Sequence, residues 1–183
     1  QASRALATKY GVPVLIHVAE TSAEVNASQA AHAGMSPVAY LDSIGFLGPR
    51  TLAAHVVWAS PSDIAVLGSR GVAVSHNPES NMKLASGAAP VPAYLRAGVA
   101  LGLGTDGAAS NNSQNMLEAM KAAALLQKVT QLDPRALTAP DVLAMATIDG
   151  ARALGLGDVT GSLEPGKRAD VVRFHGHGPG LAN

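Results

Sequence analysis

The stretch VPVLIHVA, residues Val12–Ala19, is the part of the sequence that decides the fold. It is short, apolar and rich in β-branched side chains, which is typical of a strand buried on both faces of a parallel sheet. Thr21-Ser22-Ala23-Glu24 follows directly, and this spacing is a helix-capping box. The sequence therefore predicts a strand and, immediately after it, a helix that continues to about Ala33.

The same unit recurs along the chain. Further strands are predicted at Thr51–Trp58 and Val72–His76, and a fourth strand with its exit turn at Val99–Gly107. Helices are predicted over Gln1–Gly11, Ser36–Gly45, Ser60–Gly71, Gln114–Thr130, from Thr138 onward and over Asp149–Leu154, with a polar loop at Asn77–Ala89 and a short helix ending at Gly98. This alternation indicates an α/β fold of βα units around a parallel sheet. Four such units cannot close a (β/α)8 barrel, so we expect residues 1–155 to form about half of one.

The chain changes character after Gly155. Gly, Pro and charged residues dominate residues 156–183, and one short strand is predicted there at Ala169–Phe174. We expect this part to be a separate β segment with a Gly-rich tail.

Composition excludes several classes of function. Thirteen basic and thirteen acidic residues leave no basic stripe, which argues against nucleic-acid binding. Without Cys there are no disulfides, thiolate nucleophiles or Cys-ligated zinc. No signal peptide and no apolar run of the roughly 20 residues that span a membrane are found. The chain begins with Gln1, inside a predicted helix. We therefore expect a cytoplasmic protein that is seen as a fragment.

Ionisable side chains lie at the ends of the four predicted strands. They are His17, His55, His76 and Asp106. Because the carboxyl ends of parallel strands share one face, where sites of α/β proteins lie, we expect these groups to converge. Imidazole nitrogens and carboxylate oxygens are the ligands that a borderline divalent metal prefers. The spacing therefore predicts a metal site, with Glu20 placed over it from the turn after the first strand as a proton shuttle.

Each of these residues also has a structural interpretation. A His in an apolar run is often a hydrogen-bonded core side chain, Glu20 fits the first turn of a helix, and Asp106 fits a turn. Four coincidences at successive strand ends are less expected than one, which favours the site.

Four blocks carry a resemblance to a known family: IHVAET, AAHVVW, SHNPESNMKLASGAAPV and LGTDGAASNN. They resemble the amidohydrolase superfamily, and within it the 5-methylthioadenosine/S-adenosylhomocysteine deaminases and their chlorohydrolase-type relatives. GSLEPGKRADVV is similar to that family's return to a small β-domain. The resemblance implies that the four units are barrel strands five to eight, and that the activity is hydrolytic deamination of an adenosine derivative.

The resemblance also implies roles for single residues. His17 matches a metal ligand, and Asp106 matches an aspartate that contacts the metal and takes a proton from the attacking water. His55 matches the histidine that polarises this water, and Glu20 matches the acid/base that contacts the substrate ring. SHNPESN is implied to shape the substrate pocket, through His76, Asn77 and Ser80. The cofactor is implied to be a divalent metal, zinc first and then iron or manganese, and the intact protein a homo-oligomer.

The chain also departs from the family. The family's first-strand HxH metal ligands are absent, so we expect this chain to be inactive without a further N-terminal half. His175 and His177 also form an HxH pair, but the Gly-rich residues around it do not resemble the family's first strand. We therefore do not expect this pair to bind the metal. Two alternatives stay open: a guanine- or triazine-type amidohydrolase, and a half-barrel without catalytic function.

Overall fold

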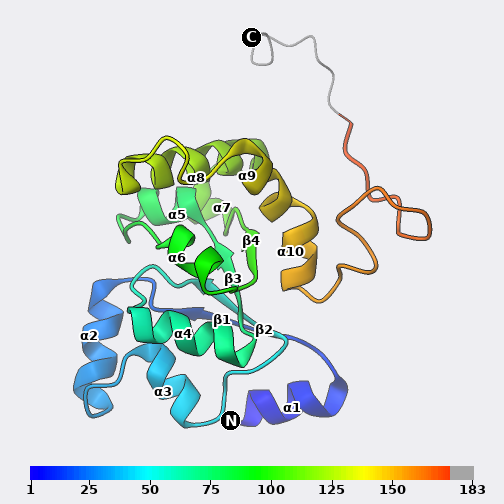
Figure 1. Ribbon diagram of the computed structural model, residues 1–183. Coiled ribbons are helices and arrows are strands. Elements are labelled where there is room, and N and C mark those ends of the chain that lie inside the picture. The colour runs from blue at the N-terminus through cyan, green and yellow to red at the C-terminus, as the bar shows by residue number, and fades with distance from the viewer. Residues whose placement is uncertain (174–183) are drawn as a thin grey trace.

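Four short strands form one parallel sheet in the computed structural model, which describes residues 1–173 (Figure 1). In sheet order they are β1 (Val14–Val18), β2 (Thr51–His55), β3 (Ala73–His76) and β4 (Leu101–Leu103). All neighbouring pairs are parallel, and sheet order follows chain order. This is the arrangement of successive βα units, with the carboxyl ends of the strands at one edge.

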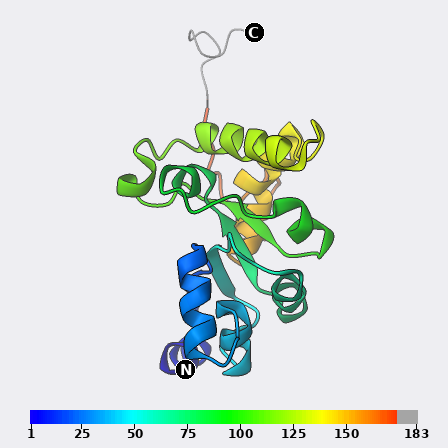
Figure 2. The same ribbon diagram turned by 90° about the vertical axis from the view of Figure 1, so that its left-hand side faces the viewer.

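Ten helices connect and cover the described strands. They are α1 (Ala2–Tyr10), α2 (Ser22–Ala31), α3 (Pro37–Ser43), α4 (Pro61–Arg70), α5 (Pro78–Lys83), α6 (Val91–Arg96), α7 (Ala108–Asn111), α8 (Met116–Gln131), α9 (Ala139–Ala146) and α10 (Ile148–Ala153). Helices α1 and α8 lie at opposite ends of the molecule in both views (Figures 1 and 2). Within residues 1–173, no helix is long and apolar enough to cross a membrane.

The capping residues form as the sequence predicts. The Thr21 hydroxyl accepts the Glu24 backbone N–H at the start of α2. Ser60 and Asp63 form a reciprocal capping box on α4, whose carboxyl end is closed by Gly71 in the left-handed region. These contacts satisfy backbone groups that a helix end otherwise leaves free.

The core lies between the sheet and the helices on one side of it. Alternate strand residues supply its centre, including Ala53, Val74 and Leu101, which are at most 3% exposed. They are neighbours in the strand register. The other face carries His17, Ala54, Ser75 and Gly102, also in register. On that side α10 approaches β4 so closely that a Cβ on Gly102 would lie 3.0 Å from the Cα of Gly150.

The structure corrects several expectations. Strand β2 ends at His55 rather than Trp58, because His55 and Val56 have positive φ angles of 69° and 44°. The predicted loop at Asn77–Ala89 contains a helix, α5.

The predicted helix at Gln114–Thr130 is α8. Its buried side chains are Ala119, Ala123 and Gln127, whereas Leu125 is 54% exposed.

The predicted strand at Ala169–Phe174 is not formed over residues 169–173, and residue 174 lies outside the described residues. No strand of the described sheet pairs with this segment, which runs away from the sheet beyond α10 (Figure 1). An extended segment without a neighbouring strand has no ladder to join. The division of the chain at residue 155 stays a prediction.

Candidate metal and proton-transfer site

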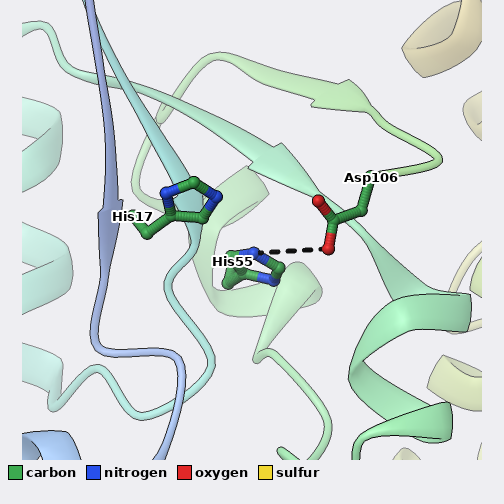
Figure 3. A group of neighbouring side chains, drawn as sticks. All are labelled: His17, His55 and Asp106. Carbon is green, nitrogen blue, oxygen red and sulfur yellow. Dashed lines mark ion pairs between the residues drawn. The ribbon is translucent and has the colours of Figure 1, made fainter. Parts of the chain in front are cut away.

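Three of the predicted residues meet at the carboxyl edge of the sheet. His17 on β1, His55 at the end of β2 and Asp106 after β4 each offer one ligand atom, and these atoms lie within 4.8 Å of one another. Figure 3 shows His17 and Asp106 approaching the His55 ring from opposite sides. The rings of His17 and His55 are stacked, with centroids 5.3 Å apart. The ligand atoms of His17 and Asp106, the two predicted metal ligands, therefore lie within 4.8 Å of each other.

His55 reaches this group because of its backbone. It is paired with Val18 in the register, and strict alternation along a strand would turn it away from the face that carries His17. Its φ of 69° interrupts the alternation at the last position of β2. A left-handed conformation is uncommon for a residue other than Gly and is typical of functional sites. The conformation is held by the Val56 backbone N–H, which donates to the Val18 carbonyl at 3.0 Å.

Glu20 lies beside the three groups. Its Oε2 is 3.8 Å from Nε2 of His55, and its Oε1 accepts a hydrogen bond from the Ser86 hydroxyl. The turn that carries it is fixed by Glu24, whose carboxylate accepts the backbone N–H groups of Ala19 and Glu20 at 2.7 and 2.8 Å. The predicted capping residue Glu24 thus also anchors the turn that presents Glu20 to the site.

Asp106 is surrounded by hydrogen-bond donors. Its Oδ2 accepts the hydroxyls of Ser80 at 2.7 Å and Ser110 at 2.8 Å, and lies 3.8 Å from Nε2 of His55. Partial burial favours the neutral carboxyl. The two hydroxyls, the Gly107 backbone N–H and His55 outweigh that effect, so the pKa of Asp106 lies below its usual value. Asp106 is therefore a carboxylate at neutral pH, able to ligate a cation or accept a proton.

The ring of His55 is oriented from its other side. Nδ1 is 2.8 Å from Oδ1 of Asn81, and both side chains are buried. An amide oxygen can only accept, so Nδ1 donates this bond, while Nε2 faces Glu20 and Asp106 at 3.8 Å and presents a lone pair to them when the ring is neutral.

This donor set fits a divalent cation. Imidazole nitrogens and carboxylate oxygens converge from separate elements. With both rings neutral all of these atoms are electron-pair donors, and a cation between them relieves their mutual repulsion. Two imidazoles and one carboxylate form an N/O set that suits zinc, iron or manganese.

The other predicted residues occupy neighbouring positions. Ser80 is buried and bonds to Asp106, as described. Asn77 is buried and accepts a hydrogen bond from Ser75. His76 is completely buried and neither ring nitrogen has a hydrogen-bond partner among residues 1–173. Burial, with a smaller contribution from His55, lowers the pKa of His76 to about 4, so this ring is neutral near neutral pH. The tail residues His175 and His177 lie outside the described residues.

Sequence reasoning missed three residues that contact the site groups: Asn81, Ser86 and Ser110. All three lie within the two long blocks SHNPESNMKLASGAAPV and LGTDGAASNN. The polar residues of these blocks were the available signal, but nothing in the sequence assigned each one to its partner.

Comparison with known proteins places the chain in a family. The model of the amidohydrolase family matches residues 1–180, and the chain belongs to that family.

Among curated relatives, the chain is 55% identical over 177 residues to a 5'-deoxyadenosine deaminase of Methanothermobacter thermautotrophicus. It is also 55% identical over 166 residues to a 5-methylthioadenosine/S-adenosylhomocysteine deaminase of Desulforudis audaxviator. These alignments cover 97% and 91% of this chain but only 41% and 38% of the relatives. The chain therefore spans about two fifths of the length of the relatives it matches.

Solved structures agree with the fold. An adenosine deaminase from Xanthomonas campestris with bound zinc superposes with a TM-score of 0.88 at 46% identity, over 91% of this chain and 38% of that one. The zinc complex of the atrazine chlorohydrolase TrzN from Arthrobacter aurescens gives a TM-score of 0.84 at 32% identity, over 91% and 36%. The four βα units thus match part of the fold of larger amidohydrolases.

Proposed function

We propose that this chain supplies the acid/base half of the active site of a metal-dependent deaminase that acts on an adenosine derivative. The observation that carries the proposal is the meeting of His17, His55 and Asp106 within 4.8 Å, with Glu20 beside them. The names of the relatives at 55% identity point to 5'-deoxyadenosine, 5-methylthioadenosine or S-adenosylhomocysteine as substrate.

His17 and Asp106 are the residues of this chain that would hold the metal, with zinc as the first choice because two similar structures contain it. His55 is assigned to the attacking water and not to the ion, which leaves two protein ligands where three or more are usual, so we propose that further ligands complete the site. When bound, the ion supplies the Lewis acidity that makes a water nucleophilic near neutral pH.

The proton transfers are assigned to three side chains. A water attacks the carbon that bears the amino group, a C–O bond forms, and the C–N bond breaks to release ammonia. Asp106, ionised at neutral pH, accepts the proton of the water and returns it to the leaving group. Glu20 protonates the adjacent ring nitrogen, which neutralises the charge that develops in the transition state, and regains a proton from the new hydroxyl group as the carbonyl forms and ammonia leaves. His55 orients the water through the lone pair on Nε2.

A guanine- or triazine-type hydrolase is the alternative within the same family. The chain is 25% identical to an E. coli guanine deaminase and 32% identical to the atrazine chlorohydrolase, against 55% for the adenosine-derivative deaminases. The higher identity favours the adenosine derivatives.

Four properties of the whole protein belong to the same proposal. We place the boundary between the barrel half and the β segment at residue 155, and propose that the protein is a cytoplasmic homo-oligomer. We also propose that His76, Asn77 and Ser80 shape the substrate pocket and, with Glu20, bind the substrate. Light scattering on the intact protein measures the oligomeric state.

The test is ammonia release by the protein that contains this chain. It is incubated with 5-methylthioadenosine, S-adenosylhomocysteine and 5'-deoxyadenosine, and its metal content is determined by elemental analysis. We expect deamination of at least one nucleoside and stoichiometric metal that is lost in His17→Ala. Metal-loaded protein that releases ammonia from none of them contradicts the proposed substrate class. Metal-free protein unaffected by His17→Ala supports a non-catalytic half-barrel instead.

A further inference from the structure

One short segment supports three of the four groups in the candidate site. Ser80 donates to Asp106, Asn81 contacts His55, and Ser86 donates to Glu20. All three lie within seven consecutive residues, and each is at most 4% exposed. Each contact joins residues at least 26 positions apart in the sequence. These contacts therefore depend on the tertiary fold and not on local turn geometry.

The segment is itself fixed to α7, which follows Asp106 in the chain. The Asn111 amide donates to Glu79 at 2.8 Å, and the Lys83 ammonium donates to the Ala109 carbonyl at 2.6 Å. Both ends of α5 are thus bonded to α7, which begins two residues after Asp106. The side chains presented by α5 are consequently held in position.

We infer that residues Ser80–Ser86 form a positioning element, and that Asn81 sets the tautomer of His55. The inference rests on the proposed function. These residues act through His55, Asp106 and Glu20, which they contact. Asn81 is the decisive member, because its amide oxygen accepts the proton on Nδ1, so that the neutral ring is the Nδ1–H tautomer with Nε2 as an acceptor.

The alternative tautomer has a distinct chemical consequence. If the Asn81 amide were reversed, its NH2 group would donate to Nδ1, and Nε2 would carry the proton. That proton would face Oε2 of Glu20 and Oδ2 of Asp106, both 3.8 Å from Nε2, and His55 would no longer offer a lone pair there. Which nitrogen of the His55 ring carries the proton, Nδ1 or Nε2, therefore distinguishes the two orientations of the Asn81 amide.

The direct test is nuclear magnetic resonance of the protein that contains this chain, labelled with ¹⁵N-histidine and assigned with His55→Gln. The nitrogen shifts distinguish a protonated ring nitrogen from an unprotonated one. We expect Nδ1–H in the wild type and in Asn81→Asp, which keeps an acceptor oxygen. Asn81→Leu, similar in size but without an acceptor, is expected to shift the ring toward Nε2–H.

Kinetics provide the second readout. Loss of a group that orients a site residue typically costs about 10–100-fold, so Asn81→Leu should lower kcat by that factor with KM little changed. Asn81→Asp should recover most of kcat. Asn26→Leu, on the exposed side of α2, is the matched control and should leave kcat unchanged.

The two serines are tested in the same way. Ser80→Ala and Ser86→Ala should each lower kcat by about tenfold. Ser69→Ala, which removes an exposed hydroxyl on α4, should leave kcat unchanged.

Two results would overturn the inference: an Nε2–H tautomer in the wild type, or Asn81→Leu with both tautomer and kcat unchanged. If Asn81→Leu does not fold, the wild-type tautomer and Asn81→Asp decide. The magnetic resonance experiment needs no substrate. If the protein releases no ammonia, the proposed function is overturned, but the tautomer of His55 can still be measured.

Discussion

The segments Asn77–Ala89 and Gly155–Arg173 both contain many polar residues but have opposite environments. Neither segment was predicted to form a helix. The first contains α5, and its side chains Asn77, Ser80, Asn81 and Ser86 are buried and polar. In the second no residue is buried, and Leu163 is 85% exposed. Polar composition therefore does not tell a solvated tail from a buried scaffold. The number of partners that each polar group finds makes the difference.

The largest expected effect is on kcat, and it compares Glu20, which Ser86 of the first segment contacts, with Glu164 of the second segment. Glu20→Gln cannot deliver the proton and should lower kcat by about 10²–10⁴-fold with metal content unchanged. The matched change Glu164→Gln, at a carboxylate that among residues 1–173 is hydrogen-bonded to Ser162 and Lys167 of its own loop, should leave kcat unchanged. The measurement is ammonia release by the intact protein. Equal losses in both variants would remove the distinction between the segments.

The next prediction concerns pH. The pKa of His76, which precedes the buried segment, is about 4 in the folded protein against 6.5 for an ordinary His. As the pH falls from 6.5 to 4, His76 binds a proton in the unfolded chain but not in the folded one. The free energy of unfolding should therefore fall by about 3 kcal/mol across this range and lose nothing more from this group below it. Urea unfolding at pH 7 and pH 4 measures the change.

The matched variant for this experiment is His76→Gln, which does not titrate. The pH dependence of its unfolding free energy should be smaller than that of the wild type by the same amount. Parallel curves for the two proteins would show that His76 is not the group responsible.

A smaller effect tests how tightly the first segment packs on the sheet. A Cβ on Gly104 would lie 2.3 Å from Oδ1 of Asn77 and 2.7 Å from Oγ of Ser75. Gly104→Ala should therefore destabilise the protein by about 1–3 kcal/mol, seen as a lower Tm. Gly107→Ala is the control, because its nearest atom, Oγ of Ser110, is 3.9 Å away. If Gly104→Ala has the wild-type Tm, the side chains of Ser75 and Asn77 move aside for the added methyl group without loss of stability.

The smallest effect is expected in the second segment. Leu163→Ser replaces an exposed side chain without buried contacts and should change the free energy of unfolding by no more than about 0.5 kcal/mol. A larger loss in the intact protein would show that a part beyond the described residues covers Leu163. The comparison between the two segments would then need revision.

Much of the fold could be predicted from local patterns. The apolar run at Val12–Ala19 and the capping residues at Thr21 and Ser60 gave the first strand and two helix starts, because these signals act between near neighbours. His17 and Asp106 could be assigned to one edge because parallel strands share it. The strand at Ala169–Phe174 was wrong over its described residues, because β-branched residues form a strand only where another strand pairs with them.

The sequence by itself determined which chemical groups stand at the strand ends: His17, His55, Glu20 and Asp106. Only the tertiary structure decided how they are held. The positive φ of His55 and its contact with Asn81 depend on neighbours in other elements, as do the hydroxyls on Asp106 and Glu20. The physical reason is range: capping and strand patterns are set within a few residues. A buried polar group, in contrast, takes whatever partner the folded chain brings within hydrogen-bonding distance.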